Sequence, residues 1–361
     1  MPRARRQAFS ASTRRLFSAM PRTVSDFDTS YVSLAPHRRG AQRGDGSPEE
    51  DSMLATTKPI SALELCEAVR MGRALDPARL NRILRLDAMH GLLEVQAATP
   101  WLAIAAELRP GDARFRVRTT MPTVGESIAR NAAGPDGTPA VAHVACITLV
   151  SAEGELRRVS RERDAELFAL TVGGQGLFGV IYSVTLRIGT LARAVERASA
   201  PDEITLQPQR AGPTLELLLP PCALADFMKQ LDPRCSDWRT PLHSVAVRRT
   251  APEDETFLRW ARRDYAEVRL SFVHVEGLGA AVRAVQLRHE LIDAAIDAGG
   301  SFQIACTADA TRAQLRACYP QLGDFIAHKR RFDPNERLVN AWYLHQRSLL
   351  GREVCDVRWA S

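Results

Sequence analysis

Lysine is scarce in this sequence, and several features typical of membrane, secreted and zinc-binding proteins are missing. Lys58, Lys229 and Lys329 stand beside 45 arginines. No run of 18 uncharged apolar residues occurs, which excludes a membrane-spanning helix, and the N-terminal stretch has no apolar segment of the secretory kind. The seven cysteines are scattered without a Cys-x-x-Cys pair. We therefore predict neither a disulfide framework nor a metal site, and we expect a cytoplasmic protein.

A net positive charge is also missing from most of the chain. Residues 1–48 hold nine arginines and three aspartates, which accounts for the whole formal net charge of +6 and leaves the remainder neutral. A surface that follows phosphates needs excess Lys and Arg on the folded body, so nucleic acid is not an expected partner. Residues 1–57 show weak periodicity and are predicted to be a basic, mostly irregular leader. Its first 48 residues should be dispensable for folding.

Hydrophobic periodicity and turn residues divide the first half of the chain into short elements. Ser61 and Glu64 form a Ser-x-x-Glu capping box, and Leu63 is among the apolar positions that follow at helical spacing. The Ser-Ala-Glu-Gly turn at 151–154 separates two runs typical of a β-hairpin, and Asp164 can cap the next helix. The predicted elements are a helix from Ser61 to Gly72, a strand at 93–97, a helix at 101–108, a hairpin of 144–150 with 155–160, a helix at 165–171 and a strand at 179–188.

The second half alternates between strands and helices in the same way. Residues 189–214 contain three prolines and are predicted to be a connection. Strands are predicted at 215–219, 244–247 and 268–273, and a helix is predicted up to Gly299-Gly300. Because the strands suit antiparallel hairpins as well as crossovers, we predict an α+β fold rather than a doubly wound parallel sheet.

Three glycines match the dinucleotide-binding pattern G-x-G-x-x-G, in the stretch Gly174-Gln-Gly176-Leu-Phe-Gly179. That pattern needs a strand before it and a helix after it, so that the helix N-terminus meets the pyrophosphate. Here a predicted helix precedes the glycines and a predicted strand follows them. The pattern therefore does not indicate a Rossmann site, and its alternative interpretation is a tight helix-to-strand turn.

Longer stretches carry a family resemblance. Residues 147–156 read Ile-Thr-Leu-Val-Ser-Ala-Glu-Gly-Glu-Leu, and residues 166–188 read Glu-Leu-Phe-Ala-Leu-Thr-Val-Gly-Gly-Gln-Gly-Leu-Phe-Gly-Val-Ile-Tyr-Ser-Val-Thr-Leu-Arg-Ile. Residues 122–134 read Pro-Thr-Val-Gly-Glu-Ser-Ile-Ala-Arg-Asn-Ala-Ala-Gly, and residues 74–84 and 319–340 add further matches. These stretches resemble the second FAD-binding subdomain and the closing segment of the vanillyl-alcohol oxidase and p-cresol methylhydroxylase (PCMH) superfamily.

The resemblance implies a fold and a cofactor. It implies a two-subdomain FAD-binding domain of the PCMH type over 58–190, with the first subdomain truncated. It also implies an α+β substrate or cap domain over 200–361, whose C-terminal segment returns to the FAD domain. By position in the family's motifs, the residues implied at the cofactor are Pro122, Thr123, Gly125, Asn131, Gly134, Gly176, Gly179 and Ile181.

Several departures from the family's pattern concern the cofactor. The Arg-Gly-x-Gly pyrophosphate loop, expected between the helix at 61–73 and Ala74, is missing. Glu126 stands in place of the second glycine of its motif, where a carboxylate would repel a pyrophosphate, and Ala133 replaces a histidine. The strand expected at 302–309, which faces the flavin in the family, lacks the usual aromatic, His or Lys side chains.

The sequence singles out no catalytic side chain. Cys306 and Thr307 lie on the strand expected to face the flavin, and His274 lies on an apolar strand. Each is a weak candidate for catalysis, and the favoured interpretation is an ordinary structural role. His143 and His345 have the same two interpretations.

Two functional hypotheses follow. The first is an FAD-dependent oxidoreductase that oxidises an alcohol or sugar-type hydroxyl of a small molecule by hydride transfer to the flavin. Its FAD would be non-covalent and weakly held, because the missing loop removes hydrogen-bond donors. The alternative is a degenerate, flavin-free relative that acts as a binding or scaffold protein. The visible spectrum of the purified protein separates the two hypotheses.

Overall fold

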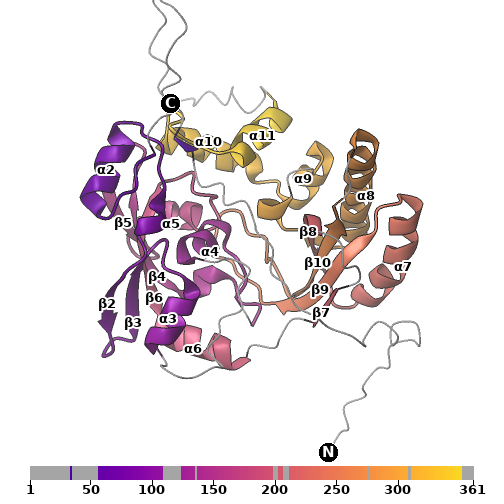
Figure 1. Ribbon diagram of the computed structural model, residues 1–361, viewed down its shortest axis with the longest axis horizontal. Coiled ribbons are helices and arrows are strands. Elements are labelled where there is room, and N and C mark those ends of the chain that lie inside the picture. Colours follow the sequence, from indigo (N-terminus) through magenta and orange to yellow (C-terminus); the bar gives the residue numbers. More distant parts are fainter. Residues whose placement is uncertain are drawn as a thin grey trace, which may run out of the picture. The chain divides into compact units, whose positions relative to one another are not determined.

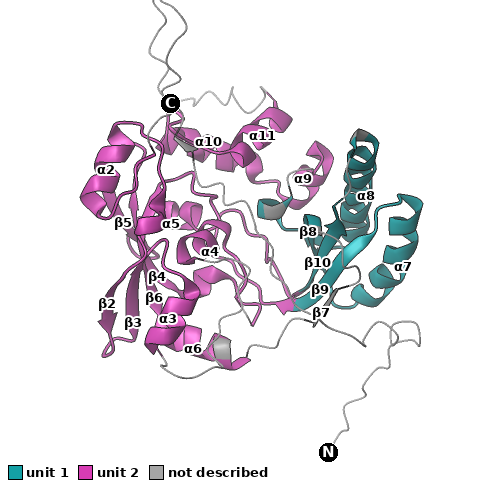
Figure 2. Cartoon of the chain, in the orientation of Figure 1, with its two compact units in different colours: residues 1–28, 201–248, 266–309 teal, residues 29–200, 249–265, 310–361 magenta. Residues whose placement is uncertain are grey.

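Two compact units make up the described part of the chain, and neither is a continuous stretch of sequence (Figure 2). The computed structural model describes residues 33–34, 56–108, 123–134, 136–197, 202–205, 211–274, 277–307 and 310–351. Unit 1 contains Pro201–Arg248 and Ala266–Asp309, and unit 2 contains Thr29–Ala200, Arg249–Tyr265 and Ala310–Ser361. The assignment of 58–190 to FAD and of 200–361 to a cap remains a prediction.

Unit 2 is built around a five-stranded antiparallel sheet with the order β2-β3-β6-β4-β5 (Figure 1). The strands are β2 (Ile83–Asp87), β3 (Leu92–Gln96), β4 (Val144–Val150), β5 (Leu156–Ser160) and β6 (Val180–Arg187). The helices of this part are α2 (Ala62–Arg70), α3 (Trp101–Leu108), α4 (Val124–Arg130), α5 (Ala165–Thr171) and α6 (Ile188–Arg197), with 3₁₀ helices at Pro77–Arg79 and Ala140–His143.

The local predictions for this sheet are confirmed. β4 and β5 form the expected hairpin, with Val150 paired to Leu156. β6 pairs with both β3 and β4, so the strand predicted at 179–188 lies in the same sheet. The helix predicted at 165–171 is α5, but Asp164 does not cap it. That residue has a φ of 56°, and its side chain makes no capping hydrogen bond.

Helix α2 begins where the capping pattern predicts it. The Ser61 hydroxyl accepts the N–H of Glu64 at 3.3 Å, and the Glu64 carboxylate accepts the N–H of Ile60 at 3.1 Å. Two of the apolar positions at helical spacing, Cys66 and Val69, are buried, but Leu63 is 81% exposed and Leu65 is fully buried instead. The i, i+3 spacing fits either of two neighbouring stripes of a short helix, and packing against the sheet selects one of them.

The C-terminal part of unit 2 adds helices and a very short second sheet. Its elements are α9 (Arg312–Cys318), α10 (Leu322–Phe332), β12 (Leu338–Val339) and α11 (Ala341–Leu350). β12 pairs with β1 (Ser33–Leu34), which lies inside the leader that was predicted to be mostly irregular. The ring of Phe178, beside the glycine-rich turn, meets that of Phe325 on α10 with centroids 5.1 Å apart.

Unit 1 is a second antiparallel sheet, with the order β11-β8-β10-β9-β7, and two helices on one side of it (Figures 1 and 2). Its strands are β7 (Asp202–Thr205), β8 (Ala211–Leu219), β9 (Leu242–Thr250), β10 (Tyr265–Val273) and β11 (Ser301–Phe302). The helices are α7 (Leu224–Asp237) and α8 (Leu278–Asp297), and a 3₁₀ helix spans Ile304–Cys306.

Two predictions in this half are wrong. Residues 189–214 are not a plain connection, because α6, β7 and the start of β8 lie within them. Ile188, Leu191 and Ala194 recur at helical spacing, and the three prolines all lie beyond the end of this helix. The strand expected at 302–309 ends at Phe302 and is followed by the 3₁₀ helix.

The predicted α+β class is confirmed, because two separate antiparallel sheets are combined with helices. None of the helices in the described ranges combines the length and apolar character that crossing a membrane requires.

Candidate functional site

The residues expected at the cofactor lie at both ends of α4 in unit 2. Thr123 is the N-cap of this helix, Gly125 is in its first turn, and Asn131 ends it in the left-handed conformation with a φ of 47°. The glycine-rich turn before β6 packs on the C-terminal end, because the N–H groups of Gly173 and Gln175 both donate to α4 carbonyls at 2.9 Å. The structure therefore brings the end of α4, with Asn131, and the glycine-rich turn together.

The remaining residues expected at the cofactor lie in the loop after α4, in the glycine-rich turn and in β6. Gly134 lies in the loop after α4, and its N–H donates to the Thr138 carbonyl at 2.7 Å. Gly176 has a φ of 74° in the turn, and Gly179 has a φ of 152° just before β6. Ile181 is buried in β6. Pro122 lies outside the described residues.

The N–H groups in the first turn of α4 are already bonded within the protein. Those of Val124, Gly125 and Glu126 donate to the Thr99 carbonyl at 3.1 Å, the Ala97 carbonyl at 2.7 Å and the Thr123 hydroxyl at 3.4 Å. A phosphate group at a helix N-terminus is held by these same donors when they are free. This helix end therefore has no backbone donors left to offer in its first turn.

Close packing inside the protein explains two of the expected glycines. A Cβ at Gly125 would lie 2.9 Å from the Ala97 carbonyl oxygen. A Cβ at Gly179 would lie 2.6 Å from Leu149 Cδ1, and its φ also disfavours any larger residue. Both positions need glycine for the fold, whether or not a ligand is present.

Asn131 is bonded at both ends of its carboxamide. Its side-chain oxygen accepts the N–H of Val141 at 2.9 Å, and its amide nitrogen donates to Glu253 at 3.3 Å. The indole N–H of Trp260 donates to its backbone carbonyl at 3.0 Å. The residue is fully buried, and it connects the end of α4 to the segment 249–265 of the same unit.

Glu126 brings a carboxylate into the first turn of α4. The residue is 9% exposed, and its carboxylate accepts a hydrogen bond from the Thr123 hydroxyl at 3.3 Å. An acidic side chain is favoured there by the partial positive charge of the helix N-terminus. A pyrophosphate at this helix end would have to displace or repel a carboxylate.

The described residues form at most an incomplete pyrophosphate cradle. The N–H groups of Gly125, Asn131 and Gly134 are all bonded to protein carbonyls. The charged group nearest the start of α4 on the helix itself is the Glu126 carboxylate. Phosphate groups are held by converging N–H donors or cations, and these three N–H groups and this helix start supply neither.

His143, in contrast, holds an acceptor without a partner. The residue is 5% exposed, and its Nδ1 lies 3.1 Å from the Thr190 hydroxyl. That hydroxyl donates its only proton to the Arg187 carbonyl at 2.9 Å, so the network assigns the imidazole proton to Nδ1. Nε2 is then a lone-pair acceptor, and it is buried without a hydrogen-bond partner among the described residues. It lies 3.7 Å from where a Cβ of Gly134 would stand.

The buried imidazole of His143 should make stability depend on pH. Burial lowers the pKa of His143 below its ordinary value of 6.5, while the nearby charge of Asp136 opposes this shift. The folded state therefore prefers the neutral ring, and the unfolded state binds more protons below pH 6.5. We expect the free energy of unfolding to be unaffected by this group above pH 7. As the pH falls below 6.5, it should decrease by at most about 1.4 kcal/mol per pH unit.

Urea unfolding at pH 5, 6, 7 and 8 measures this effect. His143→Gln serves as the matched variant, because its uncharged side chain does not titrate. The difference in unfolding free energy between the wild-type protein and His143→Gln should be constant from pH 7 to 8. It should be smaller at pH 5, because only the wild-type protein loses stability through this group. A constant difference over the whole range would contradict the assignment.

The catalytic candidates from the sequence do not form a cluster. The Thr307 hydroxyl is buried and donates to the Gln303 carbonyl at 2.9 Å. His274 and His345 are exposed. The backbone of Cys306 ends the 3₁₀ helix Ile304–Cys306, and its side chain is not among those described. No catalytic role for these residues gains support from the geometry.

The sheet of unit 1 has an apolar face and a polar face. Leu215, Leu217 and Leu219 alternate along β8 with Glu216 and Leu218, so the two sets point to opposite faces. The set with Leu217 is paired with Val268 and Leu270 of β10 and with Phe302 of β11, and all of these are buried. Helix α8, whose leucines are buried, contacts β8 and β11, and its leucines suit this apolar face. The opposite face of the sheet carries the polar residues.

Two ion pairs occupy the polar face. Arg248 on β9 donates to both carboxylate oxygens of Glu267 on β10, at 2.7 and 3.0 Å. Arg269, opposite Glu216 in the register, donates to the Glu216 carboxylate at 2.6 and 2.7 Å. Glu216 and Glu267 are 8% and 3% exposed. Arg269 also lies 3.9 Å from the Glu267 carboxylate, so two guanidinium groups balance the charge of two carboxylates.

β11 adds two polar groups to this face. Ser301 pairs with Leu218, and the N–H of Gln303 donates to the Glu216 carbonyl at 2.8 Å, so both residues share the face of Glu216. Both residues are buried, and neither Ser301 Oγ nor Gln303 Oε1 has a hydrogen-bond partner among the described residues. Buried polar atoms are nearly always hydrogen-bonded. Within the described part of the chain, these two oxygens are therefore left available to a further donor.

The sequence interpretation missed this polar face, although a signal was present. Glu216, Glu267 and Arg269 interrupt otherwise apolar strands at alternating positions. A charged residue in a run that is buried on both sides needs a partner on the same face of the sheet. The strands were predicted, but their pairing was not, and only the pairing shows which charges meet.

Comparisons with known proteins bear on the fold. No family model matches the sequence. Among solved structures, the chain is similar to a carbohydrate oxidase from Microdochium nivale that was crystallised in complex with a substrate analogue. The sequences are 10% identical, the TM-score is 0.56, and the match covers 78% of this chain and 89% of that chain. A likeness at this level of identity shows a shared fold.

Proposed function

We propose that this chain binds a carbohydrate or polyol on the polar face of the unit 1 sheet and acts as an oxidoreductase on one of its hydroxyl groups. The flavin implied by the family resemblance would be exchangeable rather than firmly held. The fold shared with a carbohydrate oxidase supports the reaction class, and the resemblance of residues 147–188 to a PCMH-type domain supports the cofactor class.

One observation carries the choice of ligand: the buried polar face formed by Glu216, Glu267, Arg248 and Arg269 with Gln303. Planar carboxylate, guanidinium and carboxamide groups suit the vicinal hydroxyls of a sugar, which both donate and accept hydrogen bonds. Since two guanidinium groups face two carboxylates, and Arg269 approaches both of them, the charges of these four groups balance, and the face suits an uncharged polyol better than a sugar acid. The carboxamide oxygen of Gln303, which has no hydrogen-bond partner among the described residues, would accept a hydrogen bond from a hydroxyl of the ligand.

A flavin-free carbohydrate-binding protein is the second candidate. The observation that favours it is the hydrogen-bonding of Gly125, Asn131 and Gly134, whose N–H groups are all used by the protein itself. The Glu126 carboxylate adds repulsion toward a pyrophosphate. This candidate shares the sugar site with the first and differs only in the redox step.

Replacing Gln303 with methionine should abolish most of the sugar affinity without harming the fold. The carboxamide oxygen has no internal partner to lose, and methionine has nearly the same shape. A lost hydrogen bond to a buried hydroxyl should weaken binding about tenfold. Calorimetric titration with glucose, lactose and sorbitol measures this change, with Gln230→Met, an exposed glutamine on α7, as the matched control.

One experiment on a single preparation of the protein distinguishes the two candidate functions. The protein is incubated with excess FAD, dialysed, and examined by its visible spectrum and for sugar-dependent dye reduction before and after dialysis. Reduction that is present with added FAD and absent after dialysis supports the oxidoreductase. Sugar binding without any reduction supports the second candidate, and no sugar binding by the wild-type protein contradicts both.

A further inference from the structure

The four charged side chains on the polar face of unit 1 form one row of alternating sign across three neighbouring strands. Glu216 lies on β8, Arg269 and Glu267 lie on β10, and Arg248 lies on β9. Arg269 joins the two pairs, because its guanidinium lies 2.6 Å from the Glu216 carboxylate and 3.9 Å from that of Glu267. A change of charge at one position therefore alters the balance of the whole row.

Within this row the guanidinium groups are more exposed than the carboxylates. The Arg269 side chain is 25% exposed and its partner Glu216 is 10% exposed, while Arg248 and its partner Glu267 are 19% and 4% exposed. Nε and Nη2 of Arg269 both donate to Oε1 of Glu216. The Glu216 carboxylate thus takes donors that the carboxylate of an acidic ligand would need.

We propose that Glu216 and Arg269 determine which charge a ligand of this face can carry, an inference that rests on the sugar site proposed above. Glu216 competes with a ligand carboxylate for the same guanidinium donors and repels it as well. Arg269 disfavours a ligand ammonium group, because it balances the carboxylates that would attract that group. An uncharged polyol meets neither obstacle, since its hydroxyls both donate and accept hydrogen bonds.

Three open-chain polyols that differ only at one end of the same six-carbon chain serve as probes. Sorbitol ends in a hydroxyl, gluconate in a carboxylate, and glucamine in an ammonium group at pH 7. Calorimetric titration of the full chain at low ionic strength measures each Kd, because salt would screen the charges that are compared. The wild-type protein should bind sorbitol at least about tenfold more tightly than either ion.

Removing one charge from the row should shift this preference in a direction set by its sign. Glu216→Gln should bind gluconate about tenfold more tightly than the wild-type protein does, because the donors that Arg269 gave to Glu216 become available to the ligand. Arg269→Gln should tighten glucamine binding by a similar factor. Asp226→Asn and Lys229→Gln make the same two charge changes in an exposed pair on α7, and both should leave all three affinities unchanged.

A further variant changes the charge of the face while keeping both ion pairs, since breaking a buried pair can prevent folding. Gln303→Glu has nearly the same shape as the natural side chain, and the oxygen Oε1 of Gln303 has no hydrogen-bond partner to lose among the described residues. The added negative charge should weaken gluconate binding and tighten glucamine binding, each about tenfold. Gln230→Glu, at an exposed position of α7, is the control.

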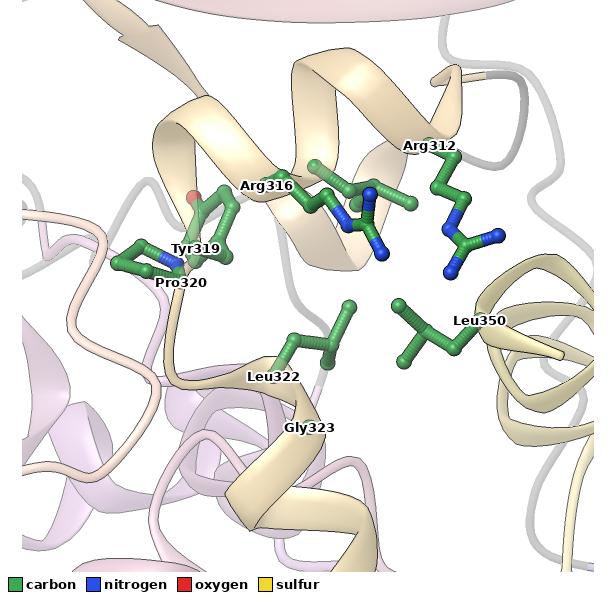
Figure 3. A pocket seen from close by; sticks show the side chains of 8 residues that line it. Arg312, Arg316, Tyr319, Pro320, Leu322, Gly323 and Leu350 are labelled. Carbon is green, nitrogen blue, oxygen red and sulfur yellow. The ribbon is translucent and has the colours of Figure 1, made fainter. Parts of the chain in front are cut away.

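A cavity in unit 2 offers a second place where a small molecule could sit, so it needs its own control. It has a volume of about 190 Å³, and Gly323 and Leu350 are among its lining residues (Figure 3). A Cβ at Gly323 meets no atom within 4 Å, so Gly323→Leu should fill the cavity and leave the affinity for sorbitol unchanged. A loss of sorbitol binding would place the sugar site in unit 2 and contradict both proposals.

The other outcomes distinguish failure of this inference from failure of the sugar site, with thermal transitions to confirm folding. An absence of saturable sorbitol, glucose and lactose binding to the wild-type protein at about 10 mM contradicts the sugar site itself. Sorbitol binding with unchanged affinities for gluconate and glucamine in the folded variants of Glu216, Arg269 and Gln303 overturns the inference and leaves the sugar site standing. Equal affinity of the wild-type protein for all three polyols overturns it too.

Discussion

Replacing Asp333 with alanine is expected to lower the free energy of unfolding by about 3–5 kcal/mol. The Asp333 carboxylate is 1% exposed and forms an ion pair with Lys329, which is fully buried. It also accepts the N–H groups of Arg337 at 2.9 Å and Leu338 at 2.8 Å. Burial lowers the pKa of Lys329 while Asp333 opposes that shift, so removing the carboxylate leaves a buried lysine without its partner.

Two matched variants make this prediction specific to burial. Asp226→Ala breaks an aspartate–lysine pair with Lys229 on α7, where both side chains are 75% exposed, and it should leave the unfolding midpoint unchanged. Lys329→Met removes the other partner but keeps the two backbone contacts of Asp333, so its effect should be smaller than that of Asp333→Ala. Urea unfolding measures all three, and an Asp333→Ala protein as stable as Asp226→Ala would refute the argument.

Gly174→Ala is expected to destabilise the chain by about 3 kcal/mol or to prevent folding. A Cβ at this position would overlap the Leu170 carbonyl oxygen and would lie 3.2 Å from the Phe178 ring. The oxygen belongs to the backbone of α5, so it cannot move aside as a flexible side chain can. The glycine therefore serves the helix-to-strand turn, as the order of the elements around the G-x-G-x-x-G pattern indicates.

Gly134→Ala is the control for this second prediction. The nearest atom to an added Cβ there is the Thr138 carbonyl oxygen at 3.4 Å, an ordinary contact. The change in unfolding free energy should stay within about 1 kcal/mol. Thermal unfolding of both variants measures the contrast, and equal stability of the two proteins would show that the turn can relax around a methyl group.

Much of the local structure followed from the sequence. The hairpin of β4 and β5, helix α5 and strand β6 were predicted at nearly their observed bounds, because turn residues and apolar periodicity act within a few neighbouring positions. Leu63, which is exposed, and α6, which was not predicted, show where sequence periodicity alone fails. A short helix has more than one apolar stripe, and prolines near a helix do not prevent it.

The candidate sites depended on contacts between distant parts of the chain. Asn131 was expected at a cofactor from its motif, yet its partner Glu253 lies 122 residues away in the sequence. The ion pair of Arg269 with Glu216 joins residues 53 positions apart, through the register of β8 and β10. No local pattern could predict either contact.

The sequence by itself determined the class of fold, four of the five strands of the first sheet and the glycine-rich turn, because these follow from backbone conformation and short-range periodicity. Only the tertiary structure decided which polar groups are already satisfied and which are left with a free acceptor. It was the folded chain that occupied the N–H groups at the start of α4 and gathered the charges of unit 1 on one face of the sheet. Hydrogen bonding and charge pairing depend on distance in space, and that distance is set only when the strands and helices pack.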